Sequence, residues 1–244
     1  MWKRDKKTVL FLTGLLTLVL FFLWTAGKYR QGQPEESAVR SSDSAPQIAE
    51  ALARVRTPES KGKIALTFDD GPSGTFTPQL LDGLAKRGVK ATFFITGQNA
   101  EENPELVRRI REEGHLIGNH TYSHLQLNSS NREKFKEELI RTNEIIKEIT
   151  GEEVVYVRPP YGSWDKTFET ELNMFPVLWT IDPLDWCTND AGCVVKKVVP
   201  KVKENSIILL HDEYASTVTA ALQIVDELKK QGYEFVTVEE ILFD

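Results

Sequence analysis

The sequence predicts an α/β protein in which about seven parallel strands form a barrel-like sheet. From residue 62 onward, short apolar runs alternate with segments of helical periodicity, and glycine or proline interrupts the chain between them. Strands that alternate with helices are typical of a parallel sheet with crossover helices. Seven strands over residues 62–244 fall short of a full eightfold barrel, so we expect barrel-like closure of a smaller kind.

Seven apolar runs are predicted to be strands. The first, Ile64–Phe68, is almost uniformly apolar and is soon followed by Gly71-Pro72, which is typical of a buried strand that stops abruptly. In parallel α/β sheets the functional residues lie at the carboxyl ends of the strands. The predicted strands comprise residues 64–68, 90–96, 116–119, 154–158, 175–181, 206–210 and 233–238.

The segments between these runs carry apolar residues at helical spacing. Leu80, Leu81 and Leu84 show this spacing in the first predicted helix, and Gly88 follows it as a stop. Pro104 begins the second helix, where its missing N–H is not needed. The predicted helices comprise residues 77–86, 105–113, 132–149, 194–203 and 220–230.

Residues 8–27 are predicted to be a transmembrane helix, because this run contains no charged side chain and about twenty apolar residues span a bilayer. Four basic residues precede it, which places residues 1–7 in the cytoplasm and the rest outside the cell membrane. A cleaved signal peptide, with 25–27 as a weak cleavage site, is the alternative and would give a secreted protein. Residues 28–61 are rich in Ser, Gln, Glu, Ala and Pro, so we expect an extracytoplasmic linker to a domain over residues 62–244.

The charge of the chain argues against a nucleic-acid partner. The formal net charge is −6, and residues 31–244 carry 24 basic and 35 acidic side chains. Phosphate binding needs a basic face, which this composition does not predict. The sequence implies no protein partner.

The two cysteines suit an exported protein. Cys187 and Cys193 are close in the chain, and a lone pair at this spacing in an oxidising compartment favours a small-loop disulfide over a metal site. Two free thiols are the competing interpretation.

Paired carboxylates follow the first strand. Asp69 and Asp70 stand side by side between a buried strand and Gly71-Pro72. Two buried carboxylates repel each other and raise a pKa unless a cation or hydrogen-bond donors lie beside them. The pair therefore predicts a metal site.

Two histidines follow the third strand. If residues 120–124 are helical, His120 and His124 share one face, as a metal site needs. With Asp70 they form a set of two histidines and one carboxylate that leaves positions open for water and substrate. A His-x-x-x-His pair alone is weak evidence, and the nearby His115 is expected to be structural.

Three further motifs stand at strand ends. Alone, residues 158–162 suggest a proline-rich turn, residues 182–186 a turn with a helix cap, and His211 in residues 209–212 a structural histidine. Their joint occurrence at strand ends of one domain favours a common site instead.

With these motifs the sequence resembles the polysaccharide deacetylase family, carbohydrate esterase family 4, also called the nodulation-protein-type deacetylase domain. The motifs are TFDDG at 67–71, HTYSH at 120–124, RPPYG at 158–162, DPLDW at 182–186 and LLHD at 209–212. The resemblance implies a distorted (β/α) barrel and an activity like that of membrane-anchored peptidoglycan N-acetylglucosamine deacetylases.

The resemblance also implies roles for the residues around the metal. Asp70, His120 and His124 would bind one divalent ion, with Zn²⁺ expected first and Co²⁺ or another ion as alternatives. Asp69 would be the general base, a division that also follows physically because a carboxylate on a metal is neutralised and its neighbour is not. Arg158 would pair with Asp69 and keep it ionised.

Further residues are assigned to substrate and proton transfer by the same resemblance. His211 would protonate the leaving amine, held as imidazolium by Asp185 or, less favoured, Asp182. The backbone N–H of Tyr161 would stabilise the developing oxyanion. Pro160 and Trp186 would contact the sugar.

The predicted reaction is hydrolysis of N-acetyl groups from N-acetylglucosamine residues of an extracellular polysaccharide, with acetate as a product. Peptidoglycan is the first substrate considered, chitooligosaccharides or other N-acetylated polysaccharides the second, and acetylated xylan the third. A glycan-binding domain on a membrane anchor without catalysis is the alternative of another class, and it would need neither Asp69 nor His211. A glycosidase is disfavoured because adjacent carboxylates do not readily straddle a glycosidic bond at about 5–9 Å.

Overall fold

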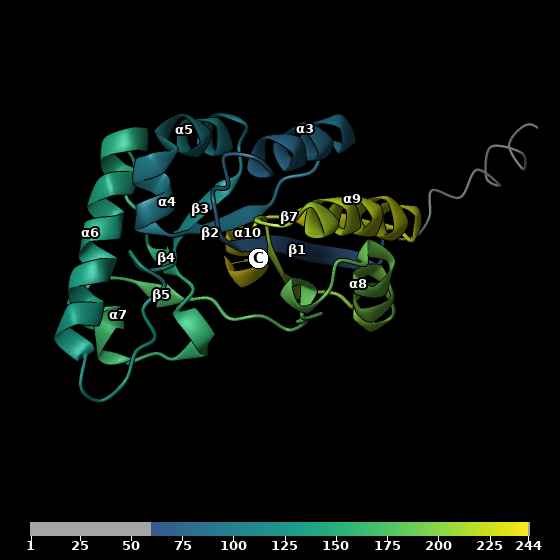
Figure 1. Cartoon of the computed structure of the whole chain (residues 1–244). Coiled ribbons are helices and arrows are strands. Elements are labelled where there is room, and N and C mark those ends of the chain that lie inside the picture. Colours follow the sequence, from purple (N-terminus) through teal and green to yellow (C-terminus); the bar gives the residue numbers. More distant parts are fainter. Residues whose placement is uncertain (1–59, 244) are drawn as a thin grey trace, which may run out of the picture. The chain divides into compact units, whose positions relative to one another are not determined.

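The computed structural model describes residues 60–243, which fold around a curled parallel sheet (Figure 1). Its strand order is β5-β4-β3-β2-β1-β6, with β7 also paired to β1, and every pair is parallel. The prediction of seven parallel strands is confirmed. The strands are β1 (Gly62–Asp70), β2 (Thr92–Ile95), β3 (Leu116–Asn119), β4 (Tyr156–Val157), β5 (Phe175–Pro176), β6 (Ile207–His211) and β7 (Tyr233–Val236).

The long strand β1 organises the sheet because three strands pair with it. Its carboxyl half pairs with β2, its amino half with β7, and its middle and end with β6. In the register with β6, Asp69 is the direct partner of His211, and in the register with β2, Asp70 is the partner of Ile95. The carboxyl ends of β1, β2 and β6 are therefore level, and the residues that follow them share one edge.

Most of the helices pack against one face of the sheet, whereas α10 contributes Val238 to a separate cluster. Buried side chains of α3, α5, α6, α8 and α9 form the main core with β1, β2 and β6. A smaller cluster, which includes Ala65, Phe94 and Val177, lies apart from it on the inner side of the curl. The helices are α3 (Thr77–Arg87), α4 (Gly97–Glu102), α5 (Pro104–Glu112), α6 (Arg132–Thr150), α7 (Thr167–Glu171), α8 (Ala191–Val198), α9 (Ala215–Lys230) and α10 (Val238–Phe243), with short 3₁₀ turns η2 (Pro160–Gly162), η3 (Asp185–Cys187) and η4 (Val199–Lys201).

The predicted strand over residues 175–181 is interrupted, and its two ends pair with different strands. Only Phe175–Pro176 pairs with β4, and Ile181 instead forms an isolated bridge to Ile208 of β6. Proline has no N–H to give to a ladder, so a strand that contains Pro176 is easily interrupted. Through this divided segment the curled sheet is linked at both edges, which is why its outline resembles a barrel.

Short helices escaped prediction. α4, α7 and α10 have only six, five and six residues, too few for a periodic pattern to stand out. Thr96 directly follows β2, and its side chain caps α4. The helix therefore begins immediately after the strand. The helix α9 begins at Ala215, five residues earlier than predicted.

The predicted cytoplasmic tail (1–7), transmembrane helix (8–27) and nearly all of the linker (28–61) lie outside the described residues. Between residues 60 and 243, no helix is both long and apolar enough to cross a membrane.

Candidate metal and catalytic site

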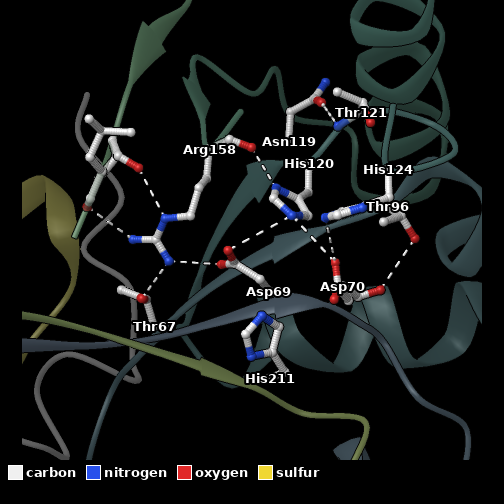
Figure 2. A network of polar contacts seen from close by, with 12 residues as sticks. Thr67, Asp69, Asp70, Thr96, Asn119, His120, Thr121, His124, Arg158 and His211 are labelled. Atoms are coloured by element: carbon white, nitrogen blue, oxygen red, sulfur yellow. Dashed lines mark hydrogen bonds and ion pairs between the residues drawn. The ribbon is translucent and has the colours of Figure 1, made fainter. Parts of the chain in front are cut away.

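The paired carboxylates at the end of β1 point in different directions (Figure 2). Asp69 is 3% exposed and lies toward Arg158, whereas Asp70 has a φ of 72° and turns toward the histidines. The turn is held through the Asp70 carbonyl, which accepts hydrogen bonds from Asn99 Nδ2 (2.7 Å) and Thr96 Oγ1 (3.3 Å). Because Asp70 has a left-handed backbone conformation, the two adjacent carboxylates lie in different environments.

Asp70, His120 and His124 come together as a candidate metal site. One ligand atom from each lies within 4.8 Å of the others, and Asp70 Oδ1 is 3.4 Å from His120 Nε2 and 3.5 Å from His124 Nε2. Asp70 Oδ1 is buried and has no hydrogen-bond donor, a state that a bound cation would relieve. These three residues fit a divalent ion.

The electrostatics of the three residues agree with that fit. Burial raises the pKa of Asp70, but the nearby imidazoles of His120, His124 and His211 outweigh this effect and lower the pKa overall. Burial lowers the pKa of His124, which favours the neutral imidazole that a metal requires. His120 Nδ1 lies 2.5 Å from the Arg158 carbonyl oxygen. A carbonyl only accepts, so Nδ1 carries the proton and Nε2 presents its lone pair to the site.

Residues 120–124 form a loop, so the helical premise for the two histidines is wrong. Thr121 and His124 have φ values of 62° and 57°, which a right-handed helix does not allow. Side chains replace the helical hydrogen bonds: the Thr121 N–H donates to Asn119 Oδ1 (2.8 Å), and the Ser123 N–H and Oγ donate to Glu138 (2.9 and 2.8 Å). The two imidazoles still meet, with ring centroids 4.9 Å apart.

Arg158 is completely buried and holds Asp69 in place. Its Nη1 donates to Asp69 Oδ1 (2.8 Å) and to Thr67 Oγ1 (2.6 Å), so both acceptors lie on β1. The remaining donors reach the carbonyls of Val177 (3.0 Å) and Leu178 (3.2 Å). Burial lowers the pKa of Arg158 and the Asp69 charge raises it, as expected of a buried ion pair. The predicted pairing of these two residues is present.

His211 has Asp185 as its partner. Asp185 is fully buried, and its Oδ1 lies 2.9 Å from His211 Nδ1. Burial alone would lower the pKa of His211, but the hydrogen bond and charge of Asp185 raise it to about 9. Asp182, the other candidate, accepts instead from the Leu184 N–H at 2.8 Å. The structure therefore places Asp185, and not Asp182, against the imidazole.

A pocket of about 410 Å³ opens over these groups, and we call it the aromatic pocket after Tyr161, Trp179, Trp186 and Tyr214 in its wall. Its polar part is formed by Asp69, Asp70, His120, His124, Asp182 and His211. Tyr161 and Trp186 are 67% and 55% exposed, so their rings are open to a ligand.

The predicted sugar contact at Pro160 is not supported. Pro160 is buried inside the 3₁₀ turn η2, and Pro159 lines the aromatic pocket in its place. Trp179 and Tyr214 were missed by sequence reasoning. Trp179 lies within the predicted strand over residues 175–181 and Tyr214 follows the strand over residues 206–210, and neither belongs to one of the five motifs.

The predicted disulfide is absent from this structure, in which Cys187 and Cys193 are free thiols. Cys187 is exposed at the end of the turn η3, whereas Cys193 lies in the first turn of α8. There the Cys193 N–H donates to the capping side chain of Asp190 (3.1 Å), which fixes the residue on the helix. His115, expected to be structural, lies outside the site and accepts a hydrogen bond from the Ala91 N–H (3.0 Å).

Comparison with known proteins relates the chain to deacetylases. It is 36% identical to the peptidoglycan-N-acetylglucosamine deacetylase PgdA of Listeria monocytogenes over 216 residues, which cover 86% of this chain and 46% of that protein. The chain thus spans about half the length of this relative. It is 42% identical to a peptidoglycan-N-acetylglucosamine deacetylase of Bacillus cereus over 193 residues, which cover 76% of this chain and 90% of the relative.

A solved structure and a family model agree with these sequences. The peptidoglycan deacetylase PdaC of Bacillus subtilis, which is named a peptidoglycan-N-acetylmuramic acid deacetylase, superposes with a TM-score of 0.72 at 36% identity. That match covers 76% of this chain and 91% of the PdaC chain. The polysaccharide deacetylase family model matches residues 56–177, which include three of the five motifs. The chain belongs to the polysaccharide deacetylase family.

Proposed function

We propose that the protein hydrolyses the N-acetyl group of N-acetylglucosamine residues in peptidoglycan and releases acetate. The observation that carries the proposal is the arrangement around one pocket: a metal-ligand set, a carboxylate held by a buried arginine, and a histidine held by a buried carboxylate. Each of these groups has a distinct use in amide hydrolysis.

Asp70, His120 and His124 would hold the divalent ion, for which we propose Zn²⁺, with Co²⁺ or another ion as an alternative. A cation bound there supplies a polarised carbonyl oxygen and a water of lowered pKa. Two histidines with one carboxylate leave coordination positions open, which catalysis by a metal requires.

Asp69 is the proposed general base. Asp69 adjoins the candidate metal ligands, since its Oδ2 is 3.8 Å from His120 Nε2. Its Oδ1 accepts a hydrogen bond from Arg158. The arginine keeps the carboxylate ionised and fixes its orientation, so one oxygen is free to take a proton from water.

His211 is the proposed general acid. With a pKa raised to about 9 it carries a proton at neutral pH, and Asp185 fixes Nδ1 so that Nε2 is the atom that donates to the leaving amine. The backbone N–H of Tyr161 is proposed to stabilise the oxyanion, a contribution of about 3 kcal/mol for one such donor. Trp186 is proposed to lie against a sugar ring.

Peptidoglycan is proposed as the substrate because named relatives act on it. N-acetylglucosamine is favoured over N-acetylmuramic acid, which the name of PdaC specifies for that protein. Chitooligosaccharides are the second candidate, in line with a chitooligosaccharide deacetylase among the relatives, and acetylated xylan is the third. An N-terminal anchor at residues 8–27 would place the domain at the cell wall.

Acetate release from peptidoglycan, chitooligosaccharides and acetylated xylan, measured side by side with the metal-loaded protein, tests the proposal. We expect release from peptidoglycan, with new free amines on glucosamine residues in the digested product. Release only from another glycan reassigns the substrate. Binding to glycan without acetate from any of the three would instead identify a non-catalytic glycan-binding domain.

A further inference from the structure

The last residue of the motif at 209–212 is buried against the turn that follows Asp70. Asp212 comes immediately after β6 and is fully buried. Its carboxyl group lies so close to the backbone of Gly71 that a Cβ atom there would be 2.6 Å from Asp212 Oδ2 and closer still to Oδ1. Gly71 does not have a positive φ, so this close approach, and not the backbone conformation, requires glycine at position 71. The proposed reaction gives Asp212 no part.

Asp212 is also bonded to the first residue of α3. Its Oδ2 accepts a hydrogen bond from Thr77 Oγ1, and Thr77 is fully buried as well. The same Thr77 Oγ1 accepts the N–H of Ser73 (2.7 Å), and the Thr77 N–H donates to the Ser73 carbonyl (3.1 Å). A chain of hydrogen bonds therefore connects the end of β6, through the start of α3, to the turn over residues 71–73.

The carbonyl groups of the same turn are held from the start of α4. The Asp70 carbonyl accepts hydrogen bonds from Thr96 Oγ1 and Asn99 Nδ2, and the Gly71 carbonyl accepts the Thr96 N–H (3.1 Å). Asp70 itself has a left-handed φ of 72°, which is unfavourable for a residue with a side chain and persists only where the surroundings impose it. Asp212 is thus part of the surroundings that hold the backbone of a metal ligand in an unfavourable conformation.

One oxygen of Asp212 has no hydrogen-bond donor. Among the described residues, nothing donates to its Oδ1, although the atom is buried. A buried polar atom without a partner costs stability, so a carboxyl group in this position needs an explanation. The contact with Gly71 provides one, because the carboxyl group fills the space in which a side chain at position 71 would begin.

We propose that Asp212 is a positioning residue for the metal ligand Asp70. Packed against Gly71 and bonded to Thr77, its carboxyl group fixes the turn that directs Asp70 toward the two histidine ligands. The inference rests on the candidate metal site and therefore on that part of the proposed function. Loosening of Asp212 should lower the affinity for the metal before any substrate is present.

Zinc competition titrations on the full chain, at a temperature where each variant is folded, test the inference. Asp212→Ala should raise the Kd for Zn²⁺ about 10–100-fold, as for other residues that orient metal ligands. Thr77→Val removes the donor to Asp212 but keeps the carboxyl group, so a similar rise shows that the position of the turn matters and not the charge of Asp212. Thr77→Ser retains the hydroxyl and should bind zinc nearly as the wild type does. Because the two residues act through one hydrogen bond, the rise in the double variant should be smaller than the product of the two single rises.

Thr92→Val is the matched control. Thr92 is a fully buried threonine at the amino end of β2, and its Oγ1 accepts the Val238 N–H (3.1 Å). Like Thr77→Val, the control variant leaves a backbone N–H without its acceptor and should lower the free energy of unfolding, which urea titrations measure. Its zinc affinity should equal that of the wild type, because Thr92 lies at the opposite edge of the sheet from the metal ligands.

Wild-type zinc affinity in both Asp212→Ala and Thr77→Val overturns the inference, as does an equal loss of affinity in Thr92→Val or a double variant that shows the full product. If Asp212→Ala does not fold, the contrast between Thr77→Val and Thr77→Ser decides. A wild-type protein that binds no zinc overturns the metal site and this inference together. Zinc binding without acetate release from any glycan overturns only the proposed function, and the titrations still decide the role of Asp212.

Discussion

Asp185 holds His211 at two points at once. Its Oδ1 lies 2.9 Å from the ring Nδ1, and its Oδ2 accepts the backbone N–H of the same residue, also at 2.9 Å. A third bond to Oδ2, from Thr217 Oγ1 (2.8 Å), fixes the carboxylate itself. Because the carboxylate is fully buried, its charge acts on the imidazole with little screening by water. Asp185 thus fixes the orientation of His211 and is the main group that raises its pKa against the effect of burial, with smaller contributions from Asp69 and Asp70.

The first prediction concerns the pH dependence of turnover. If His211 donates a proton as imidazolium, kcat should fall as the pH rises through about 9. Asp185→Asn removes the charge that raises this pKa, so the alkaline limb should move to lower pH by about one unit or more. Asp182→Asn, which removes a charge from the same loop without touching His211, should leave the position of the limb unchanged. The measurement is kcat against pH for the three proteins.

The pair of His211 and Asp185 also predicts how the free energy of unfolding changes with pH. The folded-state pKa of His211 lies above its unfolded value of about 6.5. The contribution of His211 to the free energy of unfolding is therefore complete below pH 6.5 and is lost as the pH rises toward about 9. The difference in free energy of unfolding between the wild type and Asp185→Asn should therefore shrink between pH 6 and pH 10. Urea titrations at both pH values measure it, and a constant difference would contradict the assignment.

The second prediction separates the two adjacent carboxylates. Asp69→Asn should retain the metal yet lower kcat by about 10²–10⁴-fold, the usual loss when a general base is removed. It should also lower the free energy of unfolding by about 3–5 kcal/mol, because Arg158 is left buried without its counter-charge.

Asp70→Asn is the matched variant for that comparison. It keeps the shape of the turn and should lose metal affinity first, with activity falling as a consequence. Zinc titrations and acetate assays on both variants check the distinction. Full activity of Asp69→Asn, or equal loss of metal by both variants, would mean that the base lies elsewhere.

The third prediction concerns removal of the metal. Chelation should abolish acetate release, and Zn²⁺ or Co²⁺ should restore it. The metal-free protein should also unfold at lower temperature, since an ion at a thousand times its Kd stabilises the folded state by about 4 kcal/mol. Thermal unfolding with and without chelator provides a readout independent of turnover, and activity that survives complete metal removal rules out the proposed mechanism.

The sequence predicted the strand count and most site residues because these follow from short, local patterns. Asp69 and Asp70 end a buried apolar run, and His211 ends another, so the parallel sheet brings them together without further information. The choice between Asp185 and Asp182 could not be made in this way. It depends on how the segment over residues 182–187 places each carboxylate relative to β6, which is a tertiary relationship.

The histidine pair shows a correct outcome reached from a wrong premise. The spacing of His120 and His124 suggested a helix, but two left-handed residues let a loop bring both rings to Asp70. The support for this loop comes from Glu138 of α6, which is 15 residues from Ser123 in the sequence. Local reasoning had no means of finding Glu138, whose role depends on packing.

The fourth prediction concerns Glu138 as a residue that orients the metal ligand His124. Glu138 is 8% exposed and accepts both the N–H and the Oγ of Ser123, the residue before His124. Glu138→Ala leaves a partly buried N–H without an acceptor, and the loop should relax. We expect metal affinity to fall about 10–100-fold, as for other residues that orient metal ligands, together with a stability loss of about 1–3 kcal/mol.

Two further variants separate orientation of the metal ligand from general stability. Glu138→Gln retains one acceptor oxygen and should show an intermediate loss of metal affinity, whereas Glu137→Gln, on the exposed side of α6, should bind zinc as the wild type does. Zinc competition titrations on the full chain, at a temperature where each variant is folded, provide the measurement. If Glu138→Ala loses stability but keeps wild-type zinc affinity, Glu138 supports only the fold, because His124 then reaches the metal without it.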